Sequence, residues 1–584
     1  MQDRAFSSFF LSSTSNGPPL RVGILLDRAH EHRATASIIE DIRAADFARI
    51  EIVLFEASAD AARAAAPDRR FGGAFIRRLT DRRWWSGIAW LLYVRLDRLR
   101  VGLDSDPLTA VDPAKLLDGL DTIAVGPIVD GSERRLSESD AMKLRAARLD
   151  VLLQFGFEPL DEDIFEVAAN GVWTLRYGDG ERYRGDPPHF WEMVADEPVT
   201  GVTLERRGRE PVDRQVLARA FFATDMGSLA RNRVKSYFGS THFVIQKLWE
   251  WHQSGWPYIA EPGSLTGVPD RAQAKAGQPT NREVVRWLLL RFARTLARRL
   301  VTALWRRDEI EQWQIAIRRD GPGLIAGRST DMTGFRWIEA PKGQFYADPF
   351  VVERDGRTWL FFEDYYYAQG RGVISCAAIG PDGQVGVPEI VLASEGHLSY
   401  PFVFFDGEDA YMIPETAAEA SVRLYRATDF PREWELHTEL YAGAAVDSSV
   451  WKQDGRWWLF TSLREPRGGA TMLWLFHSEM LTGPWTFHPM NPISADVRSA
   501  RGAGALHREG TRLFRPSQDG SRAYGHSFSL NEIVTLSPTS YAERRIVTIG
   551  PDWERDLLAT HTYNRSGAVE VTDGKVRRAR RQVV

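Results

Sequence analysis

The sequence predicts two domains of different fold class: a doubly wound α/β domain over residues 20–280 and a five-bladed β-propeller over residues 310–576. Three observations predict them. The first half alternates apolar runs, typical of buried parallel strands, with helical stretches. The second half contains four strand–turn–strand units whose starts lie roughly 50 residues apart, the length of a propeller blade. The chain of 584 residues is also too long for a single hydrophobic core.

Composition and charge limit the function. With 43% hydrophobic residues, 26% charged residues and a net charge of −4, the chain is an ordinary soluble protein without a nucleic-acid signature. Its single cysteine, Cys376, excludes an internal disulfide framework and a cysteine-rich zinc site. No apolar run is long enough for a membrane-spanning helix or a secretory signal. We therefore expect a cytoplasmic protein, with a flexible N-terminus at 1–19 and a basic tail at 577–584.

The α/β half begins with a buried strand, "LRVGILLD" at 20–27. A helical stretch at about 32–45, a second strand at 50–57 and a third apolar run at 149–160 continue the alternation. No G-x-G-x-x-G motif follows the first strand, so a dinucleotide cofactor is not expected.

A basic amphipathic helix is predicted to link the two domains over residues 281–309. Its core, "VVRWLLLRFARTLARRLVTALWRR" at 284–307, has two interpretations. The preferred one packs the apolar stripe against a neighbouring domain and leaves the arginines in solvent. The alternative is a membrane-peripheral helix that lies on an anionic lipid surface.

The four propeller units occupy residues 347–363, 399–415, 445–462 and 502–517, and each contains a tight turn. A fifth unit can be assembled from "EQWQIAIRR" at 311–319 and "HTYNRSGAVEVTD" at 561–573, which would close the ring. In a hairpin, the first residue of one strand lies beside the last residue of the next. The pairs that occupy this position in successive units are Asp348 and Glu363, Tyr400 and Glu415, Asp447 and Ser462, and Gly502 and Ser517.

These strand ends are candidates for a functional site, because the inner strands of a propeller begin around one end of its axis. Asp348 and Asp447 would then face one funnel, with Glu363 and Glu415 close by. The alternative is that acidic residues at strand ends only cap loop amides.

The phrases "YADPFVV" and "AAVDSSVW" resemble the five-bladed glycosidases of the arabinanase and β-xylosidase type. This resemblance implies that Asp348 is a general base and that Asp447 is an orienting carboxylate. The family's general-acid Glu would fall within 497–506, which contains Arg498 and Arg501 instead. Arginine cannot donate a proton near neutral pH, but it binds phosphates and carboxylates. The site is therefore expected to take an anionic or activated donor, unless Glu363 or Glu415 replaces the missing acid.

A closer resemblance links most of residues 310–570 to the propeller region of glucosamine inositolphosphorylceramide transferases and their bacterial relatives. It rests on phrases such as "FYADPF…WLFFEDY" (345–365), "SYPFVF…YMIPET" (399–416), "DVRSARGAGAL" (496–506) and "THTYNRSG" (560–567). The resemblance implies a carbohydrate or glycolipid substrate, and it does not by itself assign catalysis to the propeller.

Further substrate-binding candidates come from polar side chains near the same strand ends. No metal site is expected, because no ligand-spacing motif is present. A histidine on a strand can also be a hydrogen-bonded core residue, and this alternative applies to both histidines of the set. Together with Arg498 and Arg501, the candidates are Tyr400, Arg515, Gln518, Asp519, His526 and His561.

Residues 20–215 resemble the formyltransferase fold, most specifically in "GVWTLRYGDGERYRG" at 171–185, Trp191 and the Gly-Val-Thr at 201–203. Thr174 and Arg176 replace the catalytic Asn and His of that family, so formyl-transfer catalysis should be lost and a folate cofactor is not expected. The domain is then either structural or a repurposed pocket that uses Arg176 and Arg184 for an anionic ligand.

The sequence therefore predicts a transferase, with glycosyl transfer as the leading reaction, in cell-surface glycan or glycolipid biosynthesis. An activated sugar is the expected donor, and no other cofactor is implied. Three alternatives remain open: a glycoside hydrolase with a displaced acid, a non-catalytic glycan-binding protein, and a formyltransferase that acts on an amino sugar.

Overall fold

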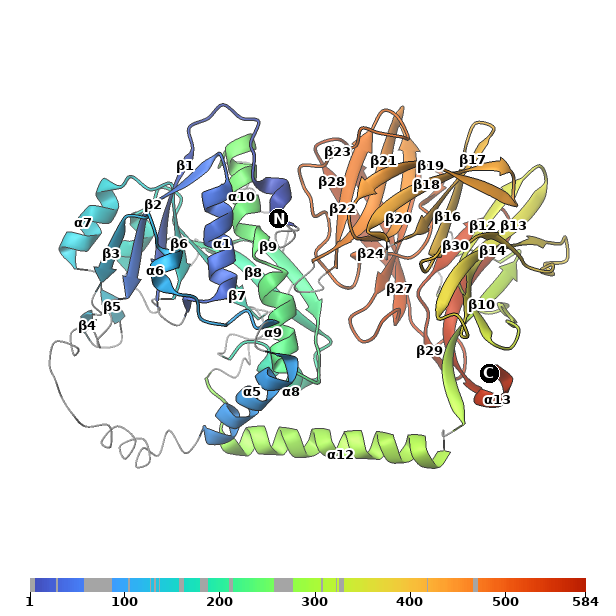
Figure 1. Ribbon diagram of the computed structural model, residues 1–584, viewed down its shortest axis with the longest axis horizontal. Helices are drawn as coiled ribbons and strands as arrows, with labels where there is room; N and C mark the ends of the chain where they lie inside the picture. The colour runs from blue at the N-terminus through green and yellow to red at the C-terminus, as the bar shows by residue number, and fades with distance from the viewer. Residues whose placement is uncertain are drawn as a thin grey trace. The chain divides into compact units, whose positions relative to one another are not determined.

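The computed structural model divides the chain into two compact units, Met1–Arg294 with Glu465–Ala470, and Thr295–Arg464 with Thr471–Val584 (Figure 1). The structure describes residues 6–583 except 28–29, 57–86, 103–104, 126–127, 131–132, 136, 157–161, 179–186, 209–213, 257–276, 306–307, 322, 325–329, 417–418 and 466–470. Arg184 lies outside the described residues.

The first unit is built on a seven-stranded mixed sheet with the strand order β3-β2-β1-β6-β7-β8-β9. The first five strands of this order are parallel, and β8 and β9 extend the sheet in antiparallel orientation. This confirms the predicted strands at 20–27, 50–57 and 149–160 as buried parallel strands. The strands are β1 (Leu20–Leu26), β2 (Ala48–Glu56), β3 (Thr122–Val125), β6 (Val151–Phe155), β7 (Val172–Tyr177), β8 (Val199–Arg207) and β9 (Arg214–Ala223).

Helices cover this sheet. The helix predicted at 32–45 is α1 (Arg33–Ala44), and the imidazole of its N-cap residue His32 accepts a hydrogen bond from the Thr35 N–H. It lies beside α10 (His242–Ser254), as Figure 1 shows. The other short elements of this unit are η1 (Ser7–Phe10), α6 (Pro113–Leu116), β4 (Ile128–Asp130), β5 (Glu133–Arg135), α7 (Glu138–Ala146), η4 (Glu162–Glu166), α8 (Phe190–Ala195) and α9 (Leu229–Phe238).

The predicted linker helix is α12 (Asn281–Trp305). Its first turns pack against α5 (Ile88–Val101) and α8 through a buried cluster that includes Val284 and Trp287. Beyond residue 291 every α12 side chain that the structure describes is exposed. Among the described helices, none combines the length and the apolar character that crossing a bilayer requires.

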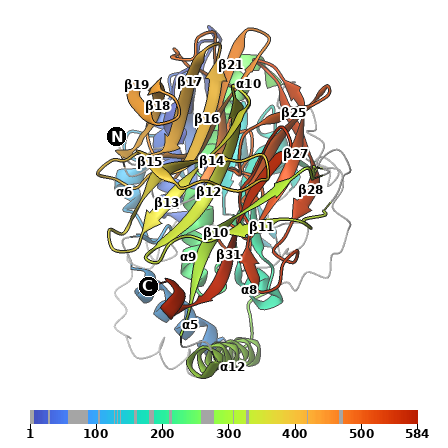
Figure 2. The same cartoon turned by 90° about the vertical axis from the view of Figure 1, so that its right-hand side faces the viewer.

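The second unit is a five-bladed β-propeller, which Figure 2 turns toward the viewer. Blade one contains β12 (Gln344–Arg354), β13 (Arg357–Tyr366), β14 (Arg371–Ile379) and β15 (Glu389–Leu392). Blade two contains β16 (Ser399–Asp406), β17 (Asp409–Glu415), β18 (Ser421–Asp429) and β19 (Glu433–Ala442). Blade three contains β20 (Ala445–Gln453), β21 (Arg456–Arg464), β22 (Thr471–Ser478) and β23 (Thr486–Phe487).

Blade four contains β24 (Arg501–Gly502), β25 (His507–Glu509), β26 (Arg512–Asp519), β27 (Ser527–Leu536) and β28 (Tyr541–Ile549). Blade five joins both ends of the propeller sequence. It combines β10 (Glu309–Arg319) and β11 (Arg336–Ile338) with β29 (Leu557–Ala559), β30 (Tyr563–Ser566) and β31 (Val569–Ala579), and α13 (Arg580–Val583) follows. β10 pairs with β31 in antiparallel register along its whole length, which confirms the predicted ring closure.

The tight turns of the repeat have the backbone that their residues favour. Asp355 and Gly356 have φ angles of 52° and 69°, and Asp454 and Gly455 have 52° and 75°. Two successive positive φ angles define the hairpin turn that matches the twist of antiparallel strands, and Asp-Gly is a preferred sequence for it.

The ring closure contains a buried ion pair. Arg318 on β10 donates to Glu570 on β31 through Nε at 2.8 Å and Nη2 at 3.0 Å, and both side chains are almost fully buried. The hydroxyl of Tyr563 donates to the same carboxylate at 2.6 Å. Because Glu570 satisfies two buried donors, its removal would leave an unpaired charge in the interior.

We therefore expect Glu570→Ala to destabilise the protein by about 3–5 kcal/mol, because it leaves the Arg318 charge buried without its carboxylate partner. Urea unfolding of the full chain, followed by circular dichroism, measures this loss. The matched control is Glu389→Ala, which breaks an ion pair with Arg432 whose side chains are 55% and 56% exposed and should therefore have much less effect on stability. Equal losses in the two variants would contradict a closure that depends on this pair.

Candidate functional site

The inner strands of blades one, two and three share an irregularity. In each of them the pairing register shifts near the start of the strand, between Ala347 and Phe350 in blade one and at the corresponding positions of the next two blades. Such bulges redirect side chains and are common next to active sites. The residues at the shift are Asp348, Tyr400 and Asp447, with positive φ angles of 50°, 46° and 52°. They are three of the four positions that the sequence repeat predicted to be equivalent, the fourth being Gly502.

Side-chain to main-chain hydrogen bonds connect these positions around the ring. Asp573 of β31 accepts from the Asp348 N–H at 3.1 Å, and Asp348 accepts from the Tyr400 N–H at 3.2 Å. The Tyr400 hydroxyl accepts from the Gly504 N–H at 2.8 Å and donates to the Gly504 carbonyl at 3.1 Å. A Cβ on Gly504 would lie 2.3 Å from a backbone oxygen, so only glycine fits there. Blades five, one, two and four thus meet at the same end of the propeller.

His561 lies between two carboxylates. Its Nδ1 is 2.8 Å from Asp573 and its Nε2 is 3.3 Å from Asp348, while Trp313 stacks on the ring at 4.0 Å. Burial lowers the pKa of His561, but the charges of Asp573 and Asp348 outweigh burial and raise the pKa above its ordinary value. A protonated imidazole that donates from both nitrogens accounts for this geometry.

The same three side chains, Asp348, His561 and Asp573, each place a possible metal-ligand atom within 4.8 Å of the others. A metal needs a free lone pair on an imidazole nitrogen. In the arrangement above, both nitrogens face carboxylates at hydrogen-bonding distance, so the trio fits a charge network better than a metal site.

Two glutamates complete what we call the carboxylate cluster, which consists of Asp348, Glu363, Glu415, Asp447 and Asp573. Burial, and then the charge of Asp447, raise the pKa of Glu415 to about 8. Burial also raises the pKa of Asp348 to about 6, although His561 lowers it. Burial and the charges of Asp348 and Glu415 raise the pKa of Glu363. At neutral pH the cluster therefore contains both ionised and protonated carboxyl groups.

Arg501 balances part of this charge. Its Nε lies 2.6 Å from Asp447 Oδ2, and its Nη2 lies 4.0 Å from Glu415 Oε2. Gln518 also approaches Asp447, at 3.5 Å, and the Tyr524 ring lies 5.2 Å from the guanidinium carbon of Arg501. Arg501 and His561 thus face five carboxyl groups within the described residues, which leaves the cluster with a negative balance.

Four other predicted residues have partners elsewhere. Arg515 is buried and makes a bidentate pair with Glu543 at 2.8 and 2.6 Å, and Arg498 pairs with Asp496 at 2.6 Å. Asp519 accepts the Ser521 N–H at 2.9 Å, and the half-buried His526 interacts electrostatically with Asp519. These contacts are local to blade four and to the loop before it, and the role of these four side chains in substrate binding stays a prediction.

Sequence reasoning missed three residues of the site. Asp573 ends the second strand segment of the predicted fifth hairpin, so the rule that found Glu363 and Glu415 would have found it too. Trp313 and His397 had no comparable signal. His397 Nε2 lies 3.6 Å from Glu363, and its ring neighbours Tyr365, which stacks on Phe345 with a centroid distance of 4.6 Å. These half-buried rings offer apolar faces beside the cluster.

The first unit contains no comparable cluster among its described residues. Thr174 donates to Gln154 at 2.9 Å, and Arg176 lies 3.1 Å from Glu205. Glu205 is fully buried and also forms a bidentate pair with Arg214 at 2.8 and 2.5 Å. Arg176 and Arg214 thus share one buried carboxylate, and this engagement of Arg176 favours the structural interpretation of this domain.

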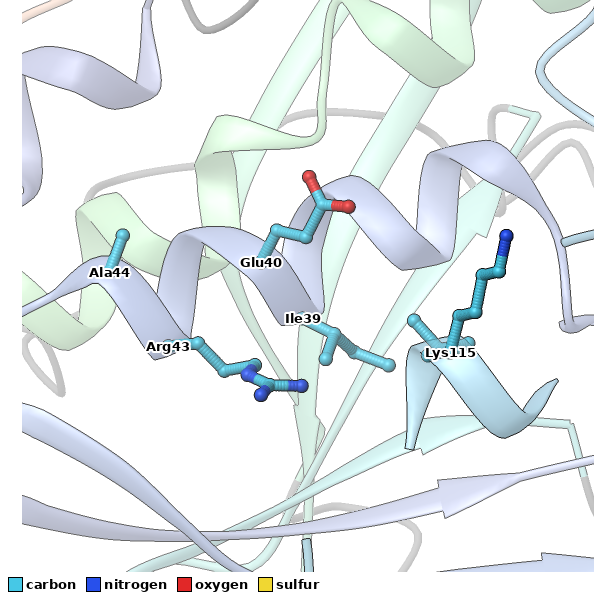
Figure 3. A pocket seen from close by; sticks show the side chains of 6 residues that line it. Ile39, Glu40, Arg43, Ala44 and Lys115 are labelled. Atoms are coloured by element: carbon cyan, nitrogen blue, oxygen red, sulfur yellow. The ribbon is translucent and has the colours of Figure 1, made fainter. Parts of the chain in front are cut away.

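A shallow hollow of about 330 Å³ lies between α1 and α6 in the same unit (Figure 3). Its charged side chains are all exposed, and none of them belongs to the predicted site. The lining residues are Ile39, Glu40, Arg43, Ala44, Lys115 and Leu116.

Comparisons with known proteins concern the propeller. Residues 336–562 match the family model described as "Glucosamine inositolphosphorylceramide transferase 1, N-terminal". Glucosamine inositolphosphorylceramide transferase 1 of Oryza sativa subsp. japonica is 38% identical over 204 residues, which are 34% of this chain and 27% of that protein. Its namesake from Arabidopsis thaliana is 32% identical over 206 residues, with the same coverage of 34% and 27%. The match thus spans 27% of the length of these relatives.

Two solved structures are also similar to the propeller. A thermostable family-43 glycoside hydrolase is 12% identical, with 37% of this chain and 83% of that chain covered and a TM-score of 0.30. The α-L-arabinanase of Cellvibrio cellulosa, complexed with arabinohexaose, is 14% identical, with 38% and 82% covered and a TM-score of 0.27. The propeller half of the chain is therefore similar to the N-terminal region of glucosamine inositolphosphorylceramide transferases, as its motifs predicted, whereas the formyltransferase resemblance of the first half stays a prediction.

Proposed function

We propose that this protein is a glycosyl-transferring enzyme of glycolipid or cell-surface glycan assembly and that the carboxylate cluster is its carbohydrate site. The observation that carries the proposal is the meeting of Asp348, Glu415 and Asp447, from three blades, in one cluster in which the two aspartates are buried and Glu415 is half-buried. All three lie within the region that is similar to the transferases. Buried carboxyl groups with separated pKa values are suited to bind sugar hydroxyls and to transfer protons.

Asp348 is proposed as the general base. The Tyr400 N–H and His561 fix the orientation of its carboxylate. Its pKa of about 6 leaves it ionised at neutral pH yet more basic than an ordinary aspartate. In a transfer reaction it would accept the proton of the attacking acceptor hydroxyl.

Glu415 is proposed as the group that protonates the leaving oxygen. With a pKa of about 8, it carries its proton at neutral pH. Burial and the Asp447 charge favour the protonated form, and Arg501 opposes them. Arg501 would therefore lower the pKa of the Glu415 acid. It lies in the segment where the resemblance to arabinanase-type glycosidases places the general acid.

The charge balance also indicates which ligand group enters the cluster. A phosphate beside five carboxyl groups and two cations would be repelled, so the donor whose leaving oxygen Glu415 protonates would be a glycoside rather than a sugar phosphate. A neutral sugar or the ammonium group of an amino sugar is better suited to the cluster. The relatives' name pairs glucosamine with inositolphosphorylceramide, and we propose an amino sugar as the group bound here.

Hydrolysis of a glycosidic bond is the second candidate, and the raised pKa of Glu415 is the observation that favours it. The same base and acid would then act on a water molecule in place of an acceptor hydroxyl. The N-terminal unit is given no catalytic role in either candidate, because Arg176 is engaged with Glu205.

We expect the pH profile of kcat/KM to be bell-shaped. Activity should rise as Asp348 loses its proton around pH 6 and fall as Glu415 loses its proton around pH 8. Because the carboxyl groups of the cluster interact, both limbs report apparent pKa values of the cluster rather than those of single groups. Glu415→Gln should lower kcat and remove the alkaline limb, and a variant that keeps this limb would contradict the role of Glu415.

The same shifts predict a stability effect. A carboxyl group whose pKa is raised by folding stabilises the folded protein at low pH, and this contribution is lost as the pH rises through the raised value. Glu415→Gln should therefore raise the melting temperature relative to the wild type more at about pH 9 than at about pH 6, because the wild type buries an ionised Glu415 only at the higher pH. Calorimetric melting at the two pH values measures this difference, and a gain independent of pH would count against the raised pKa.

Asp348→Asn should reduce kcat by about 10²–10⁴-fold with little change in melting temperature, because it removes the base and keeps the shape. The matched control is Asp409→Asn, which alters an exposed ion pair with Arg426 and should keep full activity. Mass analysis of products formed in ¹⁸O-labelled water separates the two reactions. Heavy oxygen in the released sugar identifies hydrolysis, and its absence from a glycosylated acceptor identifies transfer.

Calorimetry should detect a preference of about tenfold or more for glucosamine over glucose, because the ammonium group gains charge-assisted hydrogen bonds in the acidic cluster. Asp447→Asn should reduce this preference, and the Asp409→Asn control should keep it. Equal affinity for both sugars, or tight binding that depends on a phosphate group, would contradict the amino-sugar assignment.

A further inference from the structure

We propose that α5 and α12 form a docking surface for a membrane with anionic lipid headgroups. This α5–α12 surface consists of the exposed apolar and arginine side chains of Ile88–Val101 and Asn281–Trp305. The proposal does not depend on the reaction assigned to the propeller.

Exposed apolar side chains are concentrated on these two helices. Thirteen of the 22 large apolar side chains that are exposed in the described part of the chain lie on α5 and α12, which comprise 14 and 25 residues. Leu289 and Phe292 of α12 are 62% and 66% exposed, and Leu96 and Leu99 of α5 are 57% and 59% exposed. Exposed patches of this kind mark interaction surfaces in soluble proteins.

On each helix a subset of these side chains follows the spacing of a single face. Val285, Leu289, Phe292, Leu296 and Leu300 follow one another at intervals of three or four residues, the spacing of a single helical face. Leu92, Leu96 and Leu99 repeat this spacing on α5.

The other side of α5 and the first turns of α12 pack into the first unit. Val284 and Trp287 of α12 and Trp90 of α5 are buried in one cluster. The rings of Tyr93 and Trp287 meet at 5.2 Å, and the Ala89 N–H donates to Asn281 at 2.8 Å. Figure 1 shows α5 beside the first turns of α12. The outward stripes therefore lie on neighbouring helices that the fold holds in place.

The charge of the α5–α12 surface indicates what kind of partner binds to it. The chain as a whole has a net charge of −4, yet α12 contains six arginines and one acidic residue, and α5 contains three arginines and one. The acidic residue of α5, Asp97, is buried and accepts hydrogen bonds from Ser228 and from the Ala230 N–H at the start of α9. The exposed charges that accompany the apolar stripes are thus almost entirely positive.

This combination is typical of a helix that lies in the membrane interface with its leucines in the acyl boundary and its arginines among anionic headgroups. A second copy of this chain would bring two strongly positive surfaces together, which opposes self-association through the same patch. The arginines also prevent either helix from crossing the bilayer.

The test is flotation of the full chain with vesicles of phosphatidylcholine alone and of phosphatidylcholine with about 30% phosphatidylglycerol, the composition that supplies negative surface charge. The wild type should bind the anionic vesicles and be released by salt. The double variant Leu289→Glu, Phe292→Glu should lower the partition coefficient at least about tenfold, since it removes buried apolar area and adds negative charge. Arg286→Gln and Arg294→Gln should each lower it about fivefold on anionic vesicles only.

The matched control is Val387→Glu, Val534→Glu, which changes two residues of the propeller that are 87% and 62% exposed. This control should bind like the wild type, and melting temperatures should show that all variants are folded. The proposal is overturned if the wild type ignores both kinds of vesicle or if the control loses binding as strongly as the α12 variant. It is also overturned if sedimentation equilibrium finds a dimer that the α12 variant dissociates while lipid binding is absent.

Discussion

The contact of His561 with two buried carboxylates, Asp348 and Asp573, is the interaction on which the site depends. Without a cation at this point, the closing blade and the first blade would bury two negative charges side by side, which is costly in a protein interior. His561 and Arg501 make a cluster of five carboxyl groups tolerable, but they do not neutralise it. Burial raises the pKa values of both Asp348 and Glu415, while the neighbouring His561 lowers that of Asp348 and the charge of Asp447 raises that of Glu415 further. The packing that stabilises the propeller thus also sets its proposed chemistry.

Main-chain geometry and hydrogen bonds connect the same end of successive blades around the propeller. Asp348, Tyr400 and Asp447 adopt positive φ angles at the same place in three blades, which turns their side chains toward one end. The carboxylates of Asp573 and Asp348 then bind main-chain N–H groups of the next blade. Residues that could act on a sugar therefore also hold neighbouring blades in register. For this reason we rely on isosteric amide variants rather than on truncations when function and folding have to be separated.

Much of the propeller and its site could be predicted from the sequence, because equivalent positions in successive repeats occupy equivalent places in the fold. Residue spacing gave the five blades, the closure by 311–319 and 561–573, and the equivalence of Asp348, Tyr400 and Asp447. Partners distant in sequence could not be predicted. Arg515 and Arg176 are engaged by Glu543 and Glu205, which lie 28 and 29 residues away, on the next strand but one for Arg515 and on the neighbouring strand for Arg176. The sequence placed Arg501 in the site. That its positive charge offsets the carboxylates of Asp447 and Glu415 could not be predicted, because the three residues come from three different blades. The formyltransferase resemblance and the role of Arg184 stay predictions.

The most direct test of the account is the protonation state of Glu415 in the folded protein. Infrared difference spectra between the wild type and Glu415→Gln, recorded across the pH range, report the C=O stretch that only a protonated carboxyl group has. The account predicts that this band persists at neutral pH and disappears around pH 8. A band that is lost near the ordinary glutamate pKa of about 4.3 would contradict it. Glu415 would then carry no proton at neutral pH, and the proposed protonation of the leaving oxygen would lack its donor.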